Sequence, residues 1–368
     1  MTLTNYWWLL IWIFTGGAFL ACFFPRRREM VCGKAEDHWD VVPAVALAVP
    51  YIIWAGFRTN EYGDTSAYRA VFLNAPSHLG QLPEYLATIT KDKGFSLLTV
   101  VLKCIIGNSD ILFFLIIAAV QILCIAYVCR KYSCNYWLSI FLFIASDYMG
   151  WCHNGMRQFL AITMIFAATE LLLKKKYIPL IVIILVASTF HVSALFMLPV
   201  IFIVQGKAWN KKSVLCIVAC ILVLFFVERF TDILDSALAG TQYSGMVSDW
   251  EEWQDDGTNP IRVLVYSVPM LLSLVGYKQI KAADDKLINI SVNFSILTSG
   301  IALISMVTSG IFIGRMVEMV SLWALLLLLP WELENLFTVD SSRLVSLLTV
   351  VGYIAFFYYQ MHFAWGLL

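Results

Sequence analysis

The sequence predicts an all-α, polytopic integral membrane protein with roughly 11–13 helices, some of them short re-entrant or half helices. Two observations predict this class. The 368 residues are 60% hydrophobic and 14% charged, with a mean hydropathy of +0.78, whereas soluble domains carry about 25% charged residues. Apolar runs also alternate with short polar links along the chain, and this pattern is typical of helical membrane proteins.

Composition and motifs exclude several classes of function. The net charge is zero, so charge gives no reason to expect a nucleic-acid partner. The nine cysteines lie mostly inside apolar runs without zinc-ligand spacing, which favours a packing role. The sequence contains no Gly-rich phosphate loop, no His-Glu-x-x-His and no Gly-x-Ser-x-Gly. We therefore expect no ATP motor, and we assign no metal ligand and no cofactor.

The first two apolar runs set the orientation of the chain. Residues 6–24 are long enough to span, and the arginines at 26–28 follow at once. Without a small-residue cleavage site, we interpret this run as a retained helix rather than a signal peptide. The positive-inside rule places the arginines in the cytoplasm. Residues 41–57 then return outward, so 58–93 form an extracytoplasmic loop with a short interfacial helix.

Two later apolar runs do not fit simple spans. Residues 95–106 are too short, because a span needs about 17 residues or more, and we expect a re-entrant or tilted half-helix. Residues 178–204 have lysines at both ends, which predicts a hairpin of two short helices with His191 near its tip. The other spans are expected at 111–129, 136–150, 157–173, 213–227, 261–277, 288–308, from 314 onward, and at 344–363.

This assignment places every positive cluster in the cytoplasm. The clusters are residues 26–28, 130–131, 174–176, 207–212 and 278–286. The acidic segment 228–260 is poor in lysine and is expected outside. No linker or internal repeat divides the chain, so residues 1–368 are predicted to form a single integral membrane domain.

The segment 58–69 has a high density of charged and tyrosine side chains and is expected at the outer face. It follows an apolar run directly and holds two arginines, a glutamate, an aspartate and two tyrosines. Charges at a membrane boundary are costly unless they are solvated, paired or used. We therefore predict that this segment forms the acid/base and anion-binding edge of an active site that faces away from the cytoplasm.

Arg157 and Arg315 each begin a helix close after a glycine. An arginine there opposes the helix dipole, which favours anions at the N-terminus. The arrangement is explained if an anion lies between them, because a helix N-terminus and a guanidinium together bind phosphate or pyrophosphate well. The alternative is that the outer arginines extend to lipid headgroups or pair with Asp64, Asp147 and Glu318.

Asp64 is the leading candidate base for a hydroxyl group, and His191 is the second. Asp64 could instead cap a helix that begins after it. His191 lies inside an apolar stretch with Ser193 nearby, where a hydrogen-bonded core histidine is the alternative. His153, close to Arg157, is a third and weaker candidate.

Four blocks, in order along residues 58–199, resemble the EpsG family of Wzy-like bacterial polysaccharide polymerases. The blocks are Gly63-Asp64 with Tyr68, Asp92-Lys93-Gly94-Phe95 followed by Leu97-Leu98, Met156-Arg157-Gln158 with Ala161, and Phe190-His191-x-Ser193-Ala194-Leu195 with Leu198-Pro199.

The resemblance implies a reaction at the outer face of a bacterial cytoplasmic membrane. Such enzymes move a growing glycan from undecaprenyl pyrophosphate to the non-reducing end of a new lipid-linked repeat unit, without a metal. The implied fold is similar to lipid-dependent GT-C-type glycosyltransferases. The implied partners are the lipid-linked oligosaccharide donor and acceptor and membrane lipids, with a chain-length regulator left open.

Taken together, the residues and the resemblance assign three roles. Asp64 and His191 are the catalytic candidates. The expected pyrophosphate ligands are Arg58, Arg157 and Arg315. The expected substrate contacts are Arg69, Tyr68, His153 and Gln158.

Alternative functions remain open at this point. A flippase or transporter for the same lipid-linked oligosaccharide would need polar groups through the middle of the membrane and an internal repeat. A ligase-like enzyme that attaches O-antigen would share the leaving group and differ in its acceptor. Ser-Gly pairs with His191 also allow an intramembrane serine protease, although such pairs are common where helices pack.

Overall fold

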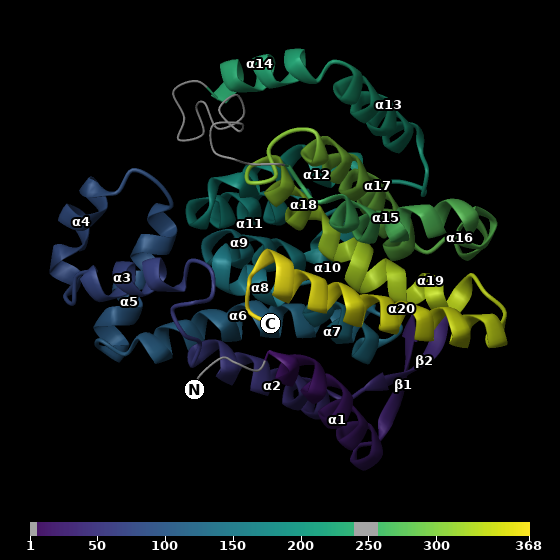
Figure 1. Ribbon diagram of the computed structural model, residues 1–368, viewed down its shortest axis with the longest axis horizontal. Coiled ribbons are helices and arrows are strands. Elements are labelled where there is room, and N and C mark those ends of the chain that lie inside the picture. The colour runs from purple at the N-terminus through teal and green to yellow at the C-terminus, as the bar shows by residue number, and fades with distance from the viewer. Residues whose placement is uncertain (1–5, 239–256) are drawn as a thin grey trace. The chain divides into compact units, whose positions relative to one another are not determined.

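The computed structural model describes residues 6–238 and 257–368, which form two compact units. Unit 1 comprises Met1–Leu195 and Val339–Leu368, and unit 2 comprises Phe196–Thr338 (Figure 1). The elements of unit 1 are α1 (Trp7–Phe23), β1 (Arg26–Val31), β2 (Lys34–Trp39), α2 (Val41–Gly56), α3 (Thr65–Asn74), the 3₁₀ helix η1 (Leu79–Gln81), α4 (Leu82–Thr88), α5 (Lys93–Ile106), α6 (Asp110–Tyr132), α7 (Tyr136–Ala145), α8 (Tyr148–Asn154), α9 (Met156–Ala167), α10 (Thr169–Leu173), α11 (Tyr177–Phe190), α20 (Val339–Tyr359) and the π-helix η4 (Gln360–Ala364).

Unit 2 is built around one buried helix, α17. This helix packs against α13, α15 and α18, and its Phe294 stacks on Trp323 with ring centres 4.2 Å apart. The 3₁₀ helix η2 (Val192–Phe196) runs from the end of unit 1 into unit 2. The elements of unit 2 are α12 (Met197–Ile203), α13 (Lys211–Phe225), α14 (Val227–Leu238), α15 (Pro260–Val275), α16 (Tyr277–Ala283), α17 (Lys286–Met306), α18 (Ile313–Leu322), the π-helix η3 (Trp323–Leu328) and α19 (Leu329–Asn335).

The helices confirm a multi-pass membrane protein. Within the described ranges, four helices are long and apolar enough to cross a membrane: Asp110–Tyr132, Lys286–Met306, Ile313–Asn335 and Val339–Ala364. Two further pairs of helices are long and apolar enough only when each pair counts as one span. They are α13 with α14, bent by 102°, and α15 with α16, bent by 75°. Shorter apolar helices are α1, α2, α7, α9, α11 and the segment Val192–Ile203.

The prediction of an all-α chain missed one antiparallel hairpin. Strands β1 and β2 pair from Arg26 with Trp39 to Val31 with Lys34. The two turn residues, Cys32 and Gly33, have φ angles of 48° and 77°. Positive φ at both positions is typical of the tight turns that match strand twist. The positive cluster at 26–28 is therefore part of a hairpin rather than a simple loop.

Two predicted spans are each divided into two helices. Residues 136–150 form α7 and the start of α8, with a break at Asp147, whose φ is +68°. The C-terminal segment reaches this break, where Trp365 donates a hydrogen bond of 2.7 Å to Asp147 Oδ2. Residues 157–173 form α9 and α10. The predicted interruption of 178–204 is confirmed, because α11 ends at Phe190 and His191 begins the turn.

Both predicted extracytoplasmic segments contain helices. Residues 58–93 hold α3, η1 and α4. Buried Lys103 of α5 fixes the end of α3 by donating to the carbonyls of Leu73 at 2.5 Å and Ala75 at 2.7 Å. In the acidic segment 228–260, α14 covers the beginning. Residues 239–256, with Trp250 and Trp253, lie outside the described residues.

Helix α6 has charged side chains at its two ends. At the N-terminal end, Asp110 pairs with Arg69 at 2.5 Å. At the C-terminal end, Arg130 pairs with Glu29 of β1 at 2.9 Å, and Lys131 pairs with Glu170 at 2.5 Å. Glu170 also pairs with Lys174. Three of the positive clusters predicted to be cytoplasmic therefore meet at the C-terminal end of α6. This helix is roughly 35 Å long, which is close to the thickness of the bilayer's hydrocarbon core.

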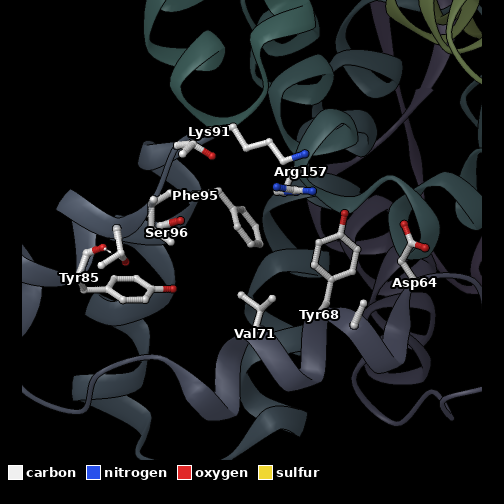
Figure 2. A pocket seen from close by; sticks show the side chains of 12 residues that line it. Asp64, Tyr68, Val71, Tyr85, Lys91, Phe95, Ser96 and Arg157 are labelled. Atoms are coloured by element: carbon white, nitrogen blue, oxygen red, sulfur yellow. Dashed lines mark hydrogen bonds between the residues drawn. The ribbon is translucent and has the colours of Figure 1, made fainter. Parts of the chain in front are cut away.

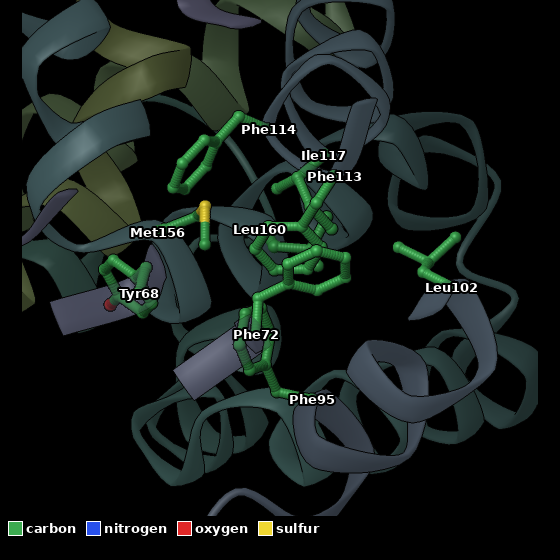
Figure 3. Packing of buried hydrophobic residues seen from close by; sticks show 9 residues of the cluster. All are labelled: Tyr68, Phe72, Phe95, Leu102, Phe113, Phe114, Ile117, Met156 and Leu160. Carbon is green, nitrogen blue, oxygen red and sulfur yellow. The ribbon is translucent and has the colours of Figure 1, made fainter. Parts of the chain in front are cut away.

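An aromatic cluster joins α3, α5, α6 and α9 (Figure 3). Phe72 of α3 stacks on Phe113 of α6, with ring centres 4.5 Å apart and planes at 17°. Phe95 of α5 and Met156 of α9 are buried in the same cluster. Helix α5 is the short helix that we expected, and it packs along α11.

We predict that Gly94→Val lowers the thermal stability of the purified protein. A Cβ atom at Gly94 would lie 2.7 Å from Cβ of Thr189 and 2.9 Å from its carbonyl carbon, so α5 could not approach α11. Overpacking of this kind typically costs about 1–3 kcal/mol. Thermal unfolding in detergent measures the effect. Gly80→Val is the matched control, since nothing lies within 4 Å of a Cβ there, and equal melting temperatures for both variants would contradict the prediction.

Candidate functional site

Unit 1 contains a cavity of about 330 Å³ beside α3 and α5 (Figure 2). Its walls come from the start of α3, the end of α4, the turn before α5, the first residues of α5 and the start of α9. Apolar contacts come from residues such as Val71 and Phe95. Its polar lining residues are Asp64, Tyr68, Tyr85, Thr88, Thr90, Lys91, Ser96 and Arg157. The cavity thus joins cations, hydroxyls, aromatic rings and one carboxylate.

Asp64 occupies the N-cap position of α3, but its side chain makes no cap hydrogen bond. The residue is exposed and lines the cavity. The preceding Gly63 has a φ of +49°, and a Cβ there would lie 2.7 Å from Oδ1 of Asn154. Glycine therefore allows the sharp turn that presents Asp64. The predicted cap role is not realised by the side chain, and the carboxylate instead lies at the edge of the cavity.

Arg157 stands in the first turn of α9 and lines the same cavity. Its Nη1 donates to Asp92 Oδ2 at 2.8 Å. The Tyr68 hydroxyl points toward the guanidinium (Figure 2), and the guanidinium carbon lies 5.9 Å from the centre of the Tyr68 ring. The structure therefore brings together three of the predicted residues: Asp64, Tyr68 and Arg157.

Asp92 and Lys91 were missing from the predicted site. Lys91 lines the cavity, and its ammonium group lies on the same side as Arg157 in Figure 2. Burial raises the pKa of the Asp92 carboxyl above its usual value, while Arg157, Lys91 and the backbone N–H of Val192 act in the opposite direction. The block Asp92-Lys93-Gly94-Phe95 could have indicated Asp92, since it was part of the resemblance.

His191 does not line the cavity but lies in a neighbouring turn. It follows α11, and its Nδ1 is 2.6 Å from Ser193 Oγ. The next residue, Val192, acts on the Asp92 carboxylate through its backbone N–H. The turn that contains His191 is thus connected to Arg157 through the Asp92 carboxylate.

Arg58 lies inside the fold and does not line the cavity. Its side chain donates to Thr65 Oγ1 and to the carbonyl of Ala55, both at 3.1 Å. Its guanidinium carbon lies 3.9 Å from the centre of the Phe114 ring. Burial lowers the pKa of Arg58 to about 9, so the side chain is still a cation at neutral pH.

Arg69 is directed toward α6 rather than into the cavity. Besides its ion pair with Asp110, it donates to Asn60 Oδ1 and to the backbone carbonyl of Arg58. Its guanidinium carbon also lies 5.5 Å from the centre of the Phe114 ring. Arg58 and Arg69 therefore share one aromatic neighbour behind the cavity wall.

His153 and Gln158 are buried core residues. His153 is fully buried, with Nδ1 2.5 Å from the Met149 carbonyl oxygen. Its ring packs against Trp54 and Tyr62, with centres 5.1 Å and 4.9 Å away. Burial lowers the pKa of His153 well below its usual value. Neither His153 nor Gln158 lines the cavity.

Arg315 belongs to unit 2, in the first turn of α18. The same unit contains Arg262, which lies in the first turn of α15 and was not predicted. Arg262 Nη2 donates to Glu318 Oε1 at 2.7 Å, and the Tyr266 hydroxyl donates to the same oxygen at 3.1 Å. Arg157 and Arg315 were selected as anion ligands because each lies in the first turn of a helix. The same criterion would also have selected Arg262. A shared anion between Arg157 and Arg315 stays a prediction.

In the part of the chain that the structure describes, no three His, Cys, Asp or Glu side chains gather as a metal site would require. Comparisons with curated proteins and with solved structures found no match. The sequence profile of the EpsG family matches residues 41–365 and so covers most of the chain. This family consists of Wzy-like polysaccharide polymerases. The chain belongs to the EpsG family, and its role is of the polysaccharide polymerase type.

Proposed function

We propose that the protein polymerises undecaprenyl-pyrophosphate-linked oligosaccharide repeat units at the outer face of the bacterial cytoplasmic membrane. It transfers the growing glycan from its lipid carrier to the non-reducing end of a new lipid-linked unit. The observation that carries this proposal is the cavity of unit 1, which is lined by Arg157 and Lys91 together with Asp64 and two tyrosines.

The cations suit a pyrophosphate leaving group. Negative charge builds up on the pyrophosphate oxygen as its bond to the anomeric carbon of the donor breaks, and fixed donors that meet this charge lower the barrier. Arg157 offers a planar fork for phosphate oxygens and Lys91 a mobile ammonium group. In this scheme Arg157 and Lys91 bind the pyrophosphate, Arg58 supports this charge from inside the fold, and no metal is required.

Asp64 suits the acceptor end of the reaction. The new glycosidic bond forms as an acceptor hydroxyl attacks the anomeric carbon of the donor, and a carboxylate can accept the hydroxyl proton or orient the group. Asp64 is exposed and lines the cavity. His191, in the turn beside Asp92, is the second candidate for this proton.

The tyrosines and the cavity size suit the reacting sugar. Tyr68 and Tyr85 line the cavity together with Ser96, and aromatic faces with nearby hydroxyls can hold a sugar ring. A volume of about 330 Å³ is at the lower end of small-molecule sites. In our proposal the cavity therefore holds only the reacting end of the donor or acceptor, and the remaining glycan stays outside.

The outer location is supported by the two ends of α6. At the N-terminal end of α6, Asp110 pairs with Arg69, which lies five residues after the cavity residue Asp64. Three positive clusters meet at the C-terminal end. Positive clusters are retained in the cytoplasm. The cavity side of unit 1 then faces outward, where the lipid-linked units are displayed. The GT-C-like fold is part of the same proposal.

The function is tested with purified protein and a synthetic undecaprenyl-pyrophosphate oligosaccharide of the native repeat, with EDTA present. A ladder of glycans on a gel supports a metal-independent polymerase. Folded protein that moves the lipid across vesicles without a ladder would favour a flippase, and transfer of one unit to a different acceptor would favour a ligase.

We predict that Arg157→Ala lowers polymerisation about 100–1000-fold, the usual cost of one pre-organised donor to a developing anion. Arg157→Lys should recover only part of the rate, because a lysine cannot reproduce the planar fork. Initial rates of ladder formation measure both. Arg343→Ala is the matched control, since Arg343 is an exposed arginine on α20 of the same unit. Equal rates for Arg157→Ala and this control would refute the assignment.

We predict that Asp64→Asn lowers the rate about 100–10,000-fold, the range for a lost general base, while thermal stability stays within the spread of repeated measurements. Asp37→Asn in β2 is the control for an exposed carboxylate away from the cavity. If Asp64→Asn is active and His191→Ala is not, the function stands and the base is His191.

A further inference from the structure

Asp92 stands at the N-cap of α5 but does not act as a cap. An aspartate there usually accepts hydrogen bonds from the first N–H groups of its helix. Asp92 makes no such side-chain bond, and its backbone carbonyl accepts from Phe95 and Ser96 instead. Its φ of +55° lies in the left-handed region, which is costly for a residue with a side chain. This conformation turns the carboxylate toward another element.

The carboxylate meets Arg157 from the interior of the fold. The Asp92 side chain is 4% exposed and the Arg157 side chain 33% exposed. Arg157 lines the cavity, whereas Asp92 is not among the lining residues. The ligand side of the guanidinium is therefore open to the cavity, and the buried carboxylate holds its other side.

The ion pair has a single close contact, between Arg157 Nη1 and Asp92 Oδ2. Asp92 Oδ1 and Arg157 Nε are both buried and make no hydrogen bond. A fork-to-fork pair would use two parallel contacts and would occupy more of the guanidinium. The single contact fixes the direction of the side chain and leaves other donors for an anion in the cavity.

The same carboxylate is connected to the turn after α11. The Val192 backbone N–H favours its charged form, and Val192 lies between His191 and Ser193. Close packing brings this turn near, because α5 approaches α11 so closely that a Cβ at Gly94 would overlap Thr189. One buried carboxylate thus reaches both the arginine in the first turn of α9 and the histidine turn.

We propose that Asp92 is the positioning residue that fixes the Arg157 guanidinium for a pyrophosphate anion in the cavity and ties the His191 turn to it. This inference rests on the proposed function for its place in the reaction. Asp92 itself does not touch the substrate. Without it, Arg157 remains a cation but explores several rotamers, and an anion that binds must first order it.

The experiment measures binding of inorganic pyrophosphate to the full-length protein in detergent by titration calorimetry. We expect the dissociation constant to rise about 10–100-fold in Asp92→Ala, by analogy with the loss of a residue that orients a metal ligand. Asp92→Asn keeps an oxygen that Arg157 can donate to and should recover part of the loss. Asp37→Ala is the control for removing a carboxylate elsewhere in the unit.

The double variant separates positioning from a general structural effect. If Asp92 acts through Arg157, adding Asp92→Ala to Arg157→Ala changes pyrophosphate binding by less than about 2-fold, since coupled residues are not additive. An equal loss in both backgrounds, or unchanged binding in Asp92→Ala, overturns the inference. Where Asp92→Ala fails to fold, the same comparison is made with Asp92→Asn.

Polymerisation assays keep this inference distinct from the proposed function. Absence of glycan ladders from the wild-type protein contradicts the function, whereas pyrophosphate binding still decides the role of Asp92. If the wild-type protein makes glycan ladders, Asp92→Asn should lower kcat more than it raises the donor KM. A misdirected guanidinium weakens its interaction with the transition state more than its interaction with the bound donor. Unchanged kcat in Asp92→Asn, with a normal melting temperature, overturns the positioning role.

Discussion

Charge in a lipid-compatible chain must be paired or brought to water, and this constraint organises unit 1. Along α6 the charged side chains lie at the two ends, with Arg69 and Asp110 at one end and Arg130, Lys131 and their partners at the other. The apolar middle of the helix can then face lipid and neighbouring helices at no electrostatic cost. The cavity forms on the side of the N-terminal pair, where the segment 58–93 adds short helices that lie outside the long spans.

The predictable part of this structure is the part governed by runs of apolar residues. Run length gave the ends of α1, α2 and α6 to within a few residues, and lysines at both ends of 178–204 predicted the break that α11 makes at His191. The hairpin Arg26–Trp39 was missed because its strands are charged and short. The local feature that predicts the hairpin is its Cys-Gly turn, where both residues have positive φ. The polar composition of the segment made it resemble a loop.

The candidate site shows where sequence reasoning stops. Helix starts that carry arginine singled out Arg157, which lines one cavity with Asp64 and Tyr68, while its role as a pyrophosphate ligand stays a prediction. Whether an arginine faces inward or outward depends on partners distant in sequence, so Arg58 and Arg69 could not be assigned before their contacts with Phe114 were known. The role of Asp92 depends on a backbone conformation that turns its side chain away from its own helix, and residue type alone does not predict that.

Phe114 supports two cations at once, with the guanidinium of Arg58 at 3.9 Å and that of Arg69 at 5.5 Å from the ring centre. A buried cation over an aromatic face is stabilised by the ring quadrupole, and the attraction is strongest where water is excluded. Positions 58, 69 and 114 are therefore physically coupled, because one ring contacts both guanidinium groups. Removal of the ring at 114 would weaken the environment of both cations together and leave each with its polar contacts alone, those to Thr65 and Ala55 for Arg58 and those to Asp110 and Asn60 for Arg69.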